Sequence, residues 1–221
     1  MERHFDEELN KVHIDLLFMS SLAEKAIVDS IKSLEKRDGE LAHKVIEQDK
    51  AIDELELKIS ERCLTLLALR QPLASDLRYI TTAMSLNGEL ERIADLAVDI
   101  AQRSVELSSL PLLKPLVDIP KLCLIAQKMV NDAVSAFVQH NTAIAKKVIS
   151  TEPEADALRN LIQDELINDY MSKDPSTTPR AVPLLLIARH LERICDHATN
   201  IAEDVIYMVE ARAIRHHHDK I

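Results

Sequence analysis

Acidic side chains recur at every fourth position in two segments of this sequence. They form one run in each half of the chain: Glu91, Asp95 and Asp99, then Glu192, Asp196, Asn200 and Asp204. Residues four apart on a helix lie about 40° and roughly 6 Å from one another, so each run predicts one polar stripe. Carboxylate and amide oxygens are the donors that hard cations prefer. Because like charges at this spacing repel, each stripe requires compensation by a cation or a basic group.

Asp49 and Asp53 form an acid pair on the predicted helix that precedes the helix of the first stripe. Asp49 precedes Pro72 by as much as Asp95 follows it, and Asp53 and Glu91 are likewise equally distant from this proline. In an antiparallel hairpin that turns at the proline, the two pairs come level. We therefore expect four carboxylates to converge between the helices, with Glu56 and Asp99 nearby.

The second half of the chain repeats this arrangement. Glu152 and Asp156 precede Pro175 at the spacing at which Asp49 and Asp53 precede Pro72, and Asp196 and Glu192 follow it at slightly shorter separations. A second acidic cluster is therefore expected. Such clusters are unfavourable unless the carboxyl groups take up protons or a cation neutralises them.

The donor set indicates which ions would fit. Because no cysteine or histidine lies on the stripes, they argue against a tetrahedral structural zinc site and for magnesium, manganese, calcium or iron. Two simpler interpretations stay open. One is a salt-bridged surface using Arg92, Arg103 and Arg193, and the other is a metal-free scaffold that docks basic partners through its acidic faces.

Enzymatic interpretations have less support. A carboxylate-bridged metalloenzyme of the ferritin type needs Glu-x-x-His on two helices, and this chain has it once, from Glu40 to His43. With two glycines in the chain, a glycine-rich phosphate-binding loop is excluded. The triplet His216 to His218 could hold a metal, but a solvated tail is the more typical role. We expect no catalytic residues.

The stripes need helices to carry them, and the composition predicts an all-α protein. The chain has 221 residues with 47% hydrophobic and 3% aromatic residues, which favours helices over strands. Six helices are expected, over about 4–36, 40–70, 72–108, 119–140, 142–170 and 178–213. Asp38 is the expected N-cap of the second, Gly39 supplies the chain reversal, Pro72 opens the third, and Pro153 disturbs the fifth.

A sequence repeat divides these helices into two sets. The string Leu-Glu-Arg-Ile-x-Asp occurs at 90–95 and at 191–196. Chance agreement of this string together with matching proline turns is improbable, so we predict two homologous three-helix bundles. The two prolines of segment 108–115 place the boundary there, giving bundles over 1–110 and 111–221.

Charge and hydropathy restrict the partners. A formal net charge of -10 disfavours nucleic acid and anionic lipid surfaces as partners. The start of the chain lacks a signal-peptide pattern, and the most apolar stretch, 181–188, is too short to span a membrane. Cys63, Cys123 and Cys195 show no metal or disulfide spacing, so we expect reduced core residues of a cytoplasmic protein.

The assembled motifs resemble those of the PhoU family, regulators of phosphate uptake in bacteria. The resemblance lies in Glu91-Arg-Ile-Ala-Asp95 and Glu192-Arg-Ile-Cys-Asp196, in segment 69–78 (Leu-Arg-Gln-Pro-Leu-Ala-Ser-Asp-Leu-Arg), and in segment 196–203. It covers nearly the whole chain. It implies two pseudo-symmetric three-helix bundles with multinuclear metal clusters at the acidic motifs. In the second half, segment 174–180 departs from the family pattern, so contacts made through Asp76 and Arg78 are expected in the first half alone.

The resemblance also implies a role. The protein would be a non-catalytic cytoplasmic adaptor that couples the ATPase subunit of the phosphate ABC transporter to the phosphate-sensing histidine kinase and represses the phosphate regulon. It would meet the membrane only through these partners, as a homodimer or higher homo-oligomer. Its metals would be divalent or trivalent ions such as iron, manganese, magnesium or zinc. The implied ligands are Glu91, Asp95, Asp99, Glu192, Asp196 and Asp204, completed by Asp49, Asp53, Glu152 and Asp156, with Asn200 as a weaker ligand.

Overall fold

Six long helices make up the protein, as a computed structural model that describes residues 2–70, 72 and 74–212 shows. The helices are α1 Glu2–Lys36, α2 Gly39–Arg70, α3 Ala74–Ser108, α4 Asp118–Gln139, α5 Thr142–Glu165 and α6 Thr178–Glu210. No strand occurs among the described residues. The predicted all-α class is confirmed. His216 to His218 lie outside the described residues.

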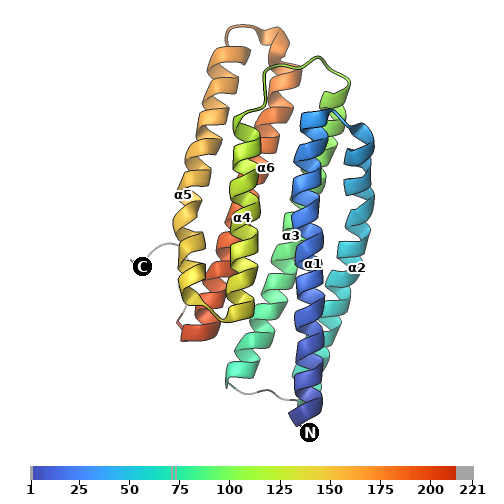
Figure 1. Cartoon of the computed structure of the whole chain (residues 1–221), viewed down its shortest axis with the longest axis vertical. Helices are drawn as coiled ribbons and strands as arrows, with labels where there is room; N and C mark the ends of the chain where they lie inside the picture. The colour runs from blue at the N-terminus through green and yellow to red at the C-terminus, as the bar shows by residue number, and fades with distance from the viewer. Residues whose placement is uncertain (1, 71, 73, 213–221) are drawn as a thin grey trace.

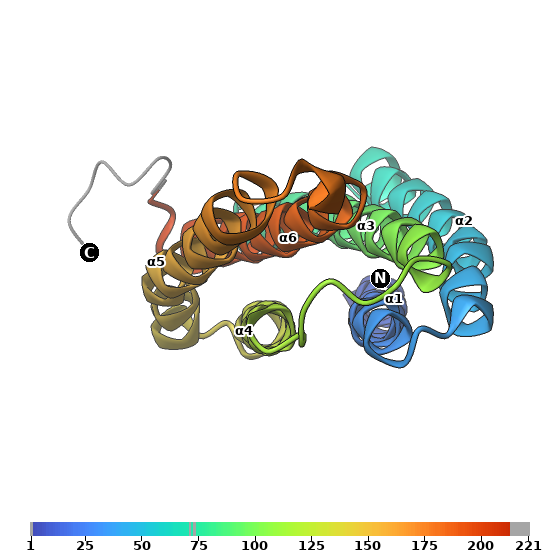
Figure 2. The ribbon, with the colours of Figure 1, turned by 90° about the horizontal axis from the view of Figure 1, so that it is seen from above.

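The helices are arranged in two layers. In Figure 2, α5, α6, α3 and α2 follow one another in a curved layer, and α4 and α1 lie against one side of it. Figure 1 shows the same order across the molecule from left to right, with α6 and α3 at its centre. One buried apolar cluster includes residues from both halves, among them Leu16 and Ile93 in the first and Phe137 and Ile194 in the second. The two predicted bundles therefore share a continuous core.

The ends of α1 and α4 show the repeat at the level of single residues. Arg37 and His140 each take a left-handed conformation, with φ of 56° and 49°. The next residue caps the following helix in both places: Asp38 Oδ1 accepts from the Leu41 amide at 3.0 Å, and Asn141 Oδ1 accepts from the Ala143 amide at 3.0 Å. The predicted N-cap at Asp38 is confirmed.

The prediction that Gly39 reverses the chain is wrong. Gly39 is the first residue of α2, and Arg37 is the residue with positive φ. A left-handed residue is the usual end of a helix, and the Asp38 amide donates to Ser33 O at 2.9 Å in the pattern of that motif. The Arg37 guanidinium also donates to Ser108 O at 2.7 Å, which anchors the turn to the end of α3.

The turn between the second and third helices of each half also differs from expectation. Pro72 precedes α3, which begins at Ala74, so it is not in the first helical turn as predicted. The fifth predicted helix contains Pro153 without interruption, but its end is a π-helical turn, Leu166–Met171. A short 3-10 turn, Pro175–Thr177, then leads into α6, and Asp174 caps it through the Ser176 amide at 3.0 Å.

Two further expectations concern burial and the contacts of Arg78. Cys63, Cys123 and Cys195 are free and buried, which confirms them as core residues. Arg78 Nε donates to Met208 O at 3.1 Å, so Arg78 ties the start of α3 to the end of α6 in the other half.

Over the described residues, we find no helix whose length and apolar character would let it cross a membrane.

Candidate metal centres

The repeated Leu-Glu-Arg-Ile-x-Asp motif has one buried and one accessible side in each half. Leu90 and Ile93 in α3, like Leu191 and Ile194 in α6, are fully buried. The acids of the motif, Glu91 and Asp95 in α3 and Glu192 and Asp196 in α6, are only half-buried. A period of 3.6 residues separates the apolar and acidic positions in this way.

Four predicted acids of the first half lie close together across the contact of α2 with α3. Burial, together with the charges of Asp53, Asp95 and Glu91, raises the pKa of Asp49 to about 6. Electrostatic influence of this kind requires short separations. The hairpin that turns near Pro72 therefore brings Asp49 of α2 within electrostatic range of Glu91 and Asp95 of α3.

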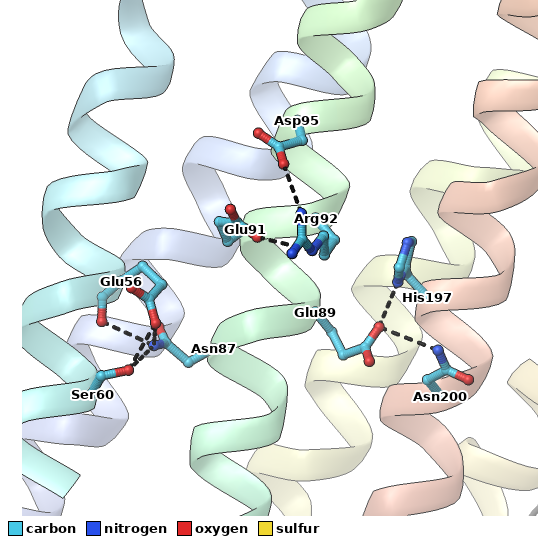
Figure 3. Close-up of polar contacts among 9 residues, drawn as sticks. All are labelled: Glu56, Ser60, Asn87, Glu89, Glu91, Arg92, Asp95, His197 and Asn200. Carbon is cyan, nitrogen blue, oxygen red and sulfur yellow. Dashed lines mark hydrogen bonds and ion pairs between the residues drawn. The ribbon is translucent and has the colours of Figure 1, made fainter. Parts of the chain in front are cut away.

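Arg92 is the basic group beside this first cluster. Its Nε lies 3.5 Å from Glu91 Oε2, and its Nη1 lies 3.4 Å from Asp95 Oδ2 (Figure 3). Because 63% of its side chain is exposed, solvent screens these pairs and they contribute little. Burial and the neighbouring acids raise the pKa of Glu91 although Arg92 opposes them. The cluster therefore keeps an excess of negative charge.

The second half brings its four acids together in the same way. Burial, together with the charges of Glu192, Glu152 and Asp156, raises the pKa of Asp196 to about 6, while His197 opposes this shift. Within this cluster Arg159 Nη2 lies 3.1 Å from Glu192 Oε1. The second cluster therefore contains an internal ion pair between α5 and α6.

The remaining stripe residues face the contact between α3 and α6. Asp99 Oδ2 lies 3.8 Å from His190 Nδ1, and Asn200 Nδ2 donates to Glu89 Oε2 at 3.3 Å. Asp204 accepts a short hydrogen bond from Ser85 Oγ. A stripe with four-residue spacing turns by about 40° at each step, so its later members leave the face that the earlier ones share. The predicted role of Asp99, Asn200 and Asp204 as ligands stays a prediction.

The contact between α3 and α6 also contains polar residues that the sequence did not single out. Glu89 Oε2 lies 2.6 Å from His197 Nδ1, and Asn200 shares the same carboxylate (Figure 3). Under the repeat, Glu89 in α3 corresponds to His190 in α6, as Asp99 does to Asn200. Asp99 with His190 and Asn200 with Glu89 are thus the same contact formed twice. The repeat alone shows that Glu89 and His190 are equivalent positions. It does not show that α3 and α6 pack together and bring these residues into contact.

The chemistry of these clusters fits hard cations. Their donors are carboxylate oxygens, and a cation would relieve the repulsion that, after burial, raises the pKa values of Asp49 and Asp196. With the side chains as they lie, no three Asp, Glu, His or Cys residues within the described ranges are arranged to hold one ion. Metal binding therefore stays a prediction that requires some side-chain movement.

Comparison with known proteins agrees with the repeat. The family model described as the PhoU domain matches residues 16–104 and again residues 119–205. A phosphate-specific transport system accessory protein PhoU homolog of Aquifex aeolicus is 41% identical over 214 residues, covering 97% of this chain and 96% of its own. The homolog of Pseudomonas aeruginosa is 36% identical over 219 residues, covering 98% and 89%.

Two crystal structures are similar over nearly the whole chain. PhoU from Pseudomonas aeruginosa has a TM-score of 0.91 and 37% identity, covering 94% of this chain and all of its own. The phosphate transport system regulatory protein PhoU from Streptococcus pneumoniae has a TM-score of 0.88 and 27% identity, with coverage of 95% and 99%. The likeness therefore extends over both halves.

Proposed function

Because this chain belongs to the PhoU family of phosphate transport accessory and regulatory proteins, we propose that it is a metal-binding regulatory adaptor of phosphate uptake. It acts in the cytoplasm as a negative regulator of the phosphate regulon. It couples the ATPase subunit of the phosphate ABC transporter to the phosphate-sensing histidine kinase. The names of its relatives, accessory protein and regulatory protein, support a role in the transport system.

The metal-binding part of the proposal depends on one observation. Both hairpins bring paired carboxylates from two helices together, and burial together with these neighbouring charges raises the pKa values of Asp49 and Asp196. Four negative charges at such a contact cost folding free energy that a bound cation would recover. Magnesium, manganese and iron suit oxygen donors of this kind.

Elemental analysis of the purified protein tests the metal sites. We expect divalent or trivalent metal in the wild-type protein and less of it in Glu91→Ala and in Asp196→Ala. Glu106→Ala and Glu210→Ala are matched controls, because these acids lie on the same two helices but beyond the clusters. Metal content that is unchanged by the first two substitutions would overturn the site assignment. If the wild-type protein contains no metal after supplementation with manganese and iron, the remaining interpretation is a metal-free scaffold with acidic faces.

A binding experiment tests the adaptor role. Purified protein should retain the transporter ATPase and the histidine kinase on affinity beads, and a chelator should weaken at least one of these interactions. Light scattering at several concentrations should show a dimer or larger oligomer. Failure to bind either partner with and without metal would contradict the adaptor function while leaving the metal sites untouched.

The proposal assigns no catalysis to the clusters. Cys195, which lies between Glu192 and Asp196 in the sequence, is fully buried, and burial raises the pKa of its thiol, with Asp196 and Glu192 adding to the shift. A thiol in that state is a poor nucleophile. Turnover of a phosphoester or a peroxide that Glu91→Ala and Asp196→Ala abolish would reverse this assignment.

A further inference from the structure

The two acidic clusters differ at one pair of equivalent positions. In α2 and α5 the repeat relates Asp38 to Asn141, Asp49 to Glu152 and Asp53 to Asp156. These pairs share one shift in residue number, and the buried Ile59 and Ile162 follow it too. The same shift relates Glu56 to Arg159. The position therefore carries a negative charge in the first half and a positive charge in the second.

In the first half, a buried asparagine positions this extra carboxylate. Asn87 is fully buried on α3, one helical turn before Glu91. Its Nδ2 donates to Glu56 O at 3.0 Å, to Glu56 Oε1 at 3.1 Å and to Ser60 Oγ at 3.1 Å (Figure 3). Glu56 is also among the acids that raise the pKa of Glu91. Its carboxylate is therefore held beside the first cluster.

The amide of Asn87 leaves one strong polar atom unused. Asn87 Oδ1 is buried and has no hydrogen-bond partner among the described residues. A buried carbonyl oxygen without a partner is costly, and most such atoms in proteins are satisfied by a side chain, a water or an ion. Amide oxygens are ordinary ligands of hard cations. Asn87 Oδ1 and Glu56 together resemble part of a coordination shell.

In the second half, an arginine occupies the corresponding place. Arg159 Nη2 lies 3.1 Å from Oε1 of Glu192, the residue equivalent to Glu91, and the two side chains are only 26% and 16% exposed. Ala188 stands where the first half has Asn87, and Gln163 stands where it has Ser60. The second cluster therefore carries its own cation, and α6 has no buried amide at the position of Asn87.

We propose that Glu56 and Asn87 add a cation position to the first cluster, and that Arg159 fills the corresponding position of the second cluster as an internal counter-cation. The first half then binds hard cations more tightly and in greater number than the second half. This inference rests on the proposed metal binding and adds three residues to it. A difference of two unit charges within a few ångströms of the ions is sufficient to change affinity by about tenfold or more.

Calorimetric titration of the full chain with Mn²⁺ alone tests the inference. Glu192→Ala/Asp196→Ala leaves only the first cluster intact, and Glu91→Ala/Asp95→Ala leaves only the second. We expect the first cluster alone to bind Mn²⁺ at least about tenfold more tightly than the second alone. Equal affinities and stoichiometries in the two backgrounds would overturn the inference.

Substitutions at the position itself sharpen the test. In the first background, Glu56→Gln and Asn87→Ala should each weaken Mn²⁺ binding about tenfold or remove one ion, whereas Glu54→Gln, an exposed acid beside Lys50, should have no effect. In the second background, Arg159→Gln should strengthen binding about tenfold. This expected gain in the Arg159→Gln variant does not depend on whether Asn87→Ala folds.

The outcomes separate this inference from the proposed function. Wild-type protein that binds no Mn²⁺ in either half contradicts both. Wild-type protein that binds Mn²⁺ alike in both halves, with no response to Glu56→Gln or Arg159→Gln, contradicts the inference and supports metal binding. Thermal unfolding of each variant, followed by circular dichroism without metal, shows that the changes in affinity are not changes in folding.

Discussion

His197 Nδ1 lies 2.6 Å from Glu89 Oε2, so a histidine of α6 and a glutamate of α3 meet at the centre of the molecule. Both side chains are mostly buried, at 17% and 22% exposure. The contact joins the first half of the chain to the second. Asp99 with His190 and Ser85 with Asp204 are further polar contacts between the same two helices.

A double-mutant cycle measures this contact. We expect His197→Ala and Glu89→Ala to be coupled by about 1 kcal/mol in the free energy of unfolding, because a mostly buried hydrogen bond of this kind contributes roughly that amount. Urea unfolding of the two single variants and the double variant gives the coupling. The exposed pair Lys50 and Glu54, with exposures of 83% and 69%, is the control and should show coupling near zero. Equal coupling in both pairs would contradict the structural role of the Glu89 contact.

Asp49→Asn should stabilise the metal-free protein at neutral pH. Burial and the neighbouring acids raise the pKa of Asp49 to about 6 in the folded state, above its ordinary value of 3.8. Its charged form therefore costs stability at pH values above about 6, and this cost disappears as pH falls toward about 4, because the folded state takes up the proton first. Solvent screens a half-buried group, so we expect a gain of roughly 1 kcal/mol.

Urea unfolding across this pH range checks the prediction for Asp49. The free energy of unfolding of Asp49→Asn should be larger than that of the wild type at pH values above about 6, and the two should be equal near pH 4. Glu47→Gln, an exposed acid on the same helix, is the control and should leave the pH dependence unchanged. Asp196→Asn should behave like Asp49→Asn, because the second cluster raises that pKa to about 6 as well. An advantage of the Asn variant that is larger in acid than at neutral pH would contradict the expected sign.

Leu90→Ala and Leu191→Ala should each destabilise the protein strongly and to a similar extent. Both leucines are fully buried in the apolar cluster that extends through both halves. Removing a buried leucine side chain costs about 2 to 5 kcal/mol. Calorimetry should show a single unfolding transition that either variant lowers, because the core is continuous. Two separate transitions, each sensitive to only one leucine, would show that the halves fold independently.

Leu57→Ala provides the reference for the core substitutions. This leucine is 68% exposed on α2, so its truncation should change stability by less than about 0.5 kcal/mol. A larger effect would indicate that the exposed apolar side chain is covered in solution.

Asp38→Ala and Asn141→Ala test the repeat at the helix caps. Each side chain accepts hydrogen bonds from the first turn of the helix that follows, and loss of such a cap costs about 1 kcal/mol. Asp38→Asn and Asn141→Asp should retain most of the stability, because either residue serves as an N-cap. Thermal unfolding of the four variants gives the comparison, and a cost at only one of the two sites would show that the halves differ in their caps.

The helices of this protein and the acids of each cluster could be predicted from the order of residues alone. The 3.6-residue period places Leu90 in the core and Glu91 outside it, and equal spacing about Pro72 brings Asp49 and Asp95 level. These relations are local or depend on a single hairpin, so residue numbers suffice to predict them. The backbone conformation at the helix ends could not be predicted as well from the sequence. The left-handed residue before α2 is Arg37 instead of Gly39, because hydrogen bonds at the end of α1 decide which residue takes that conformation.

The way in which the two halves meet depends on tertiary packing. No local pattern shows that α3 packs against α6, so the contact of Asp99 with His190 and that of Glu89 with His197 could not be predicted. The same packing separates the later stripe residues from the acids of α2 and α5, because a helix turns its side chains by about 40° over four residues while the neighbouring helix stays in place. The sequence shows that Glu56 in the first half corresponds to Arg159 in the second. The role of this difference could be inferred only from the contact of Arg159 with Glu192 and from the buried amide of Asn87.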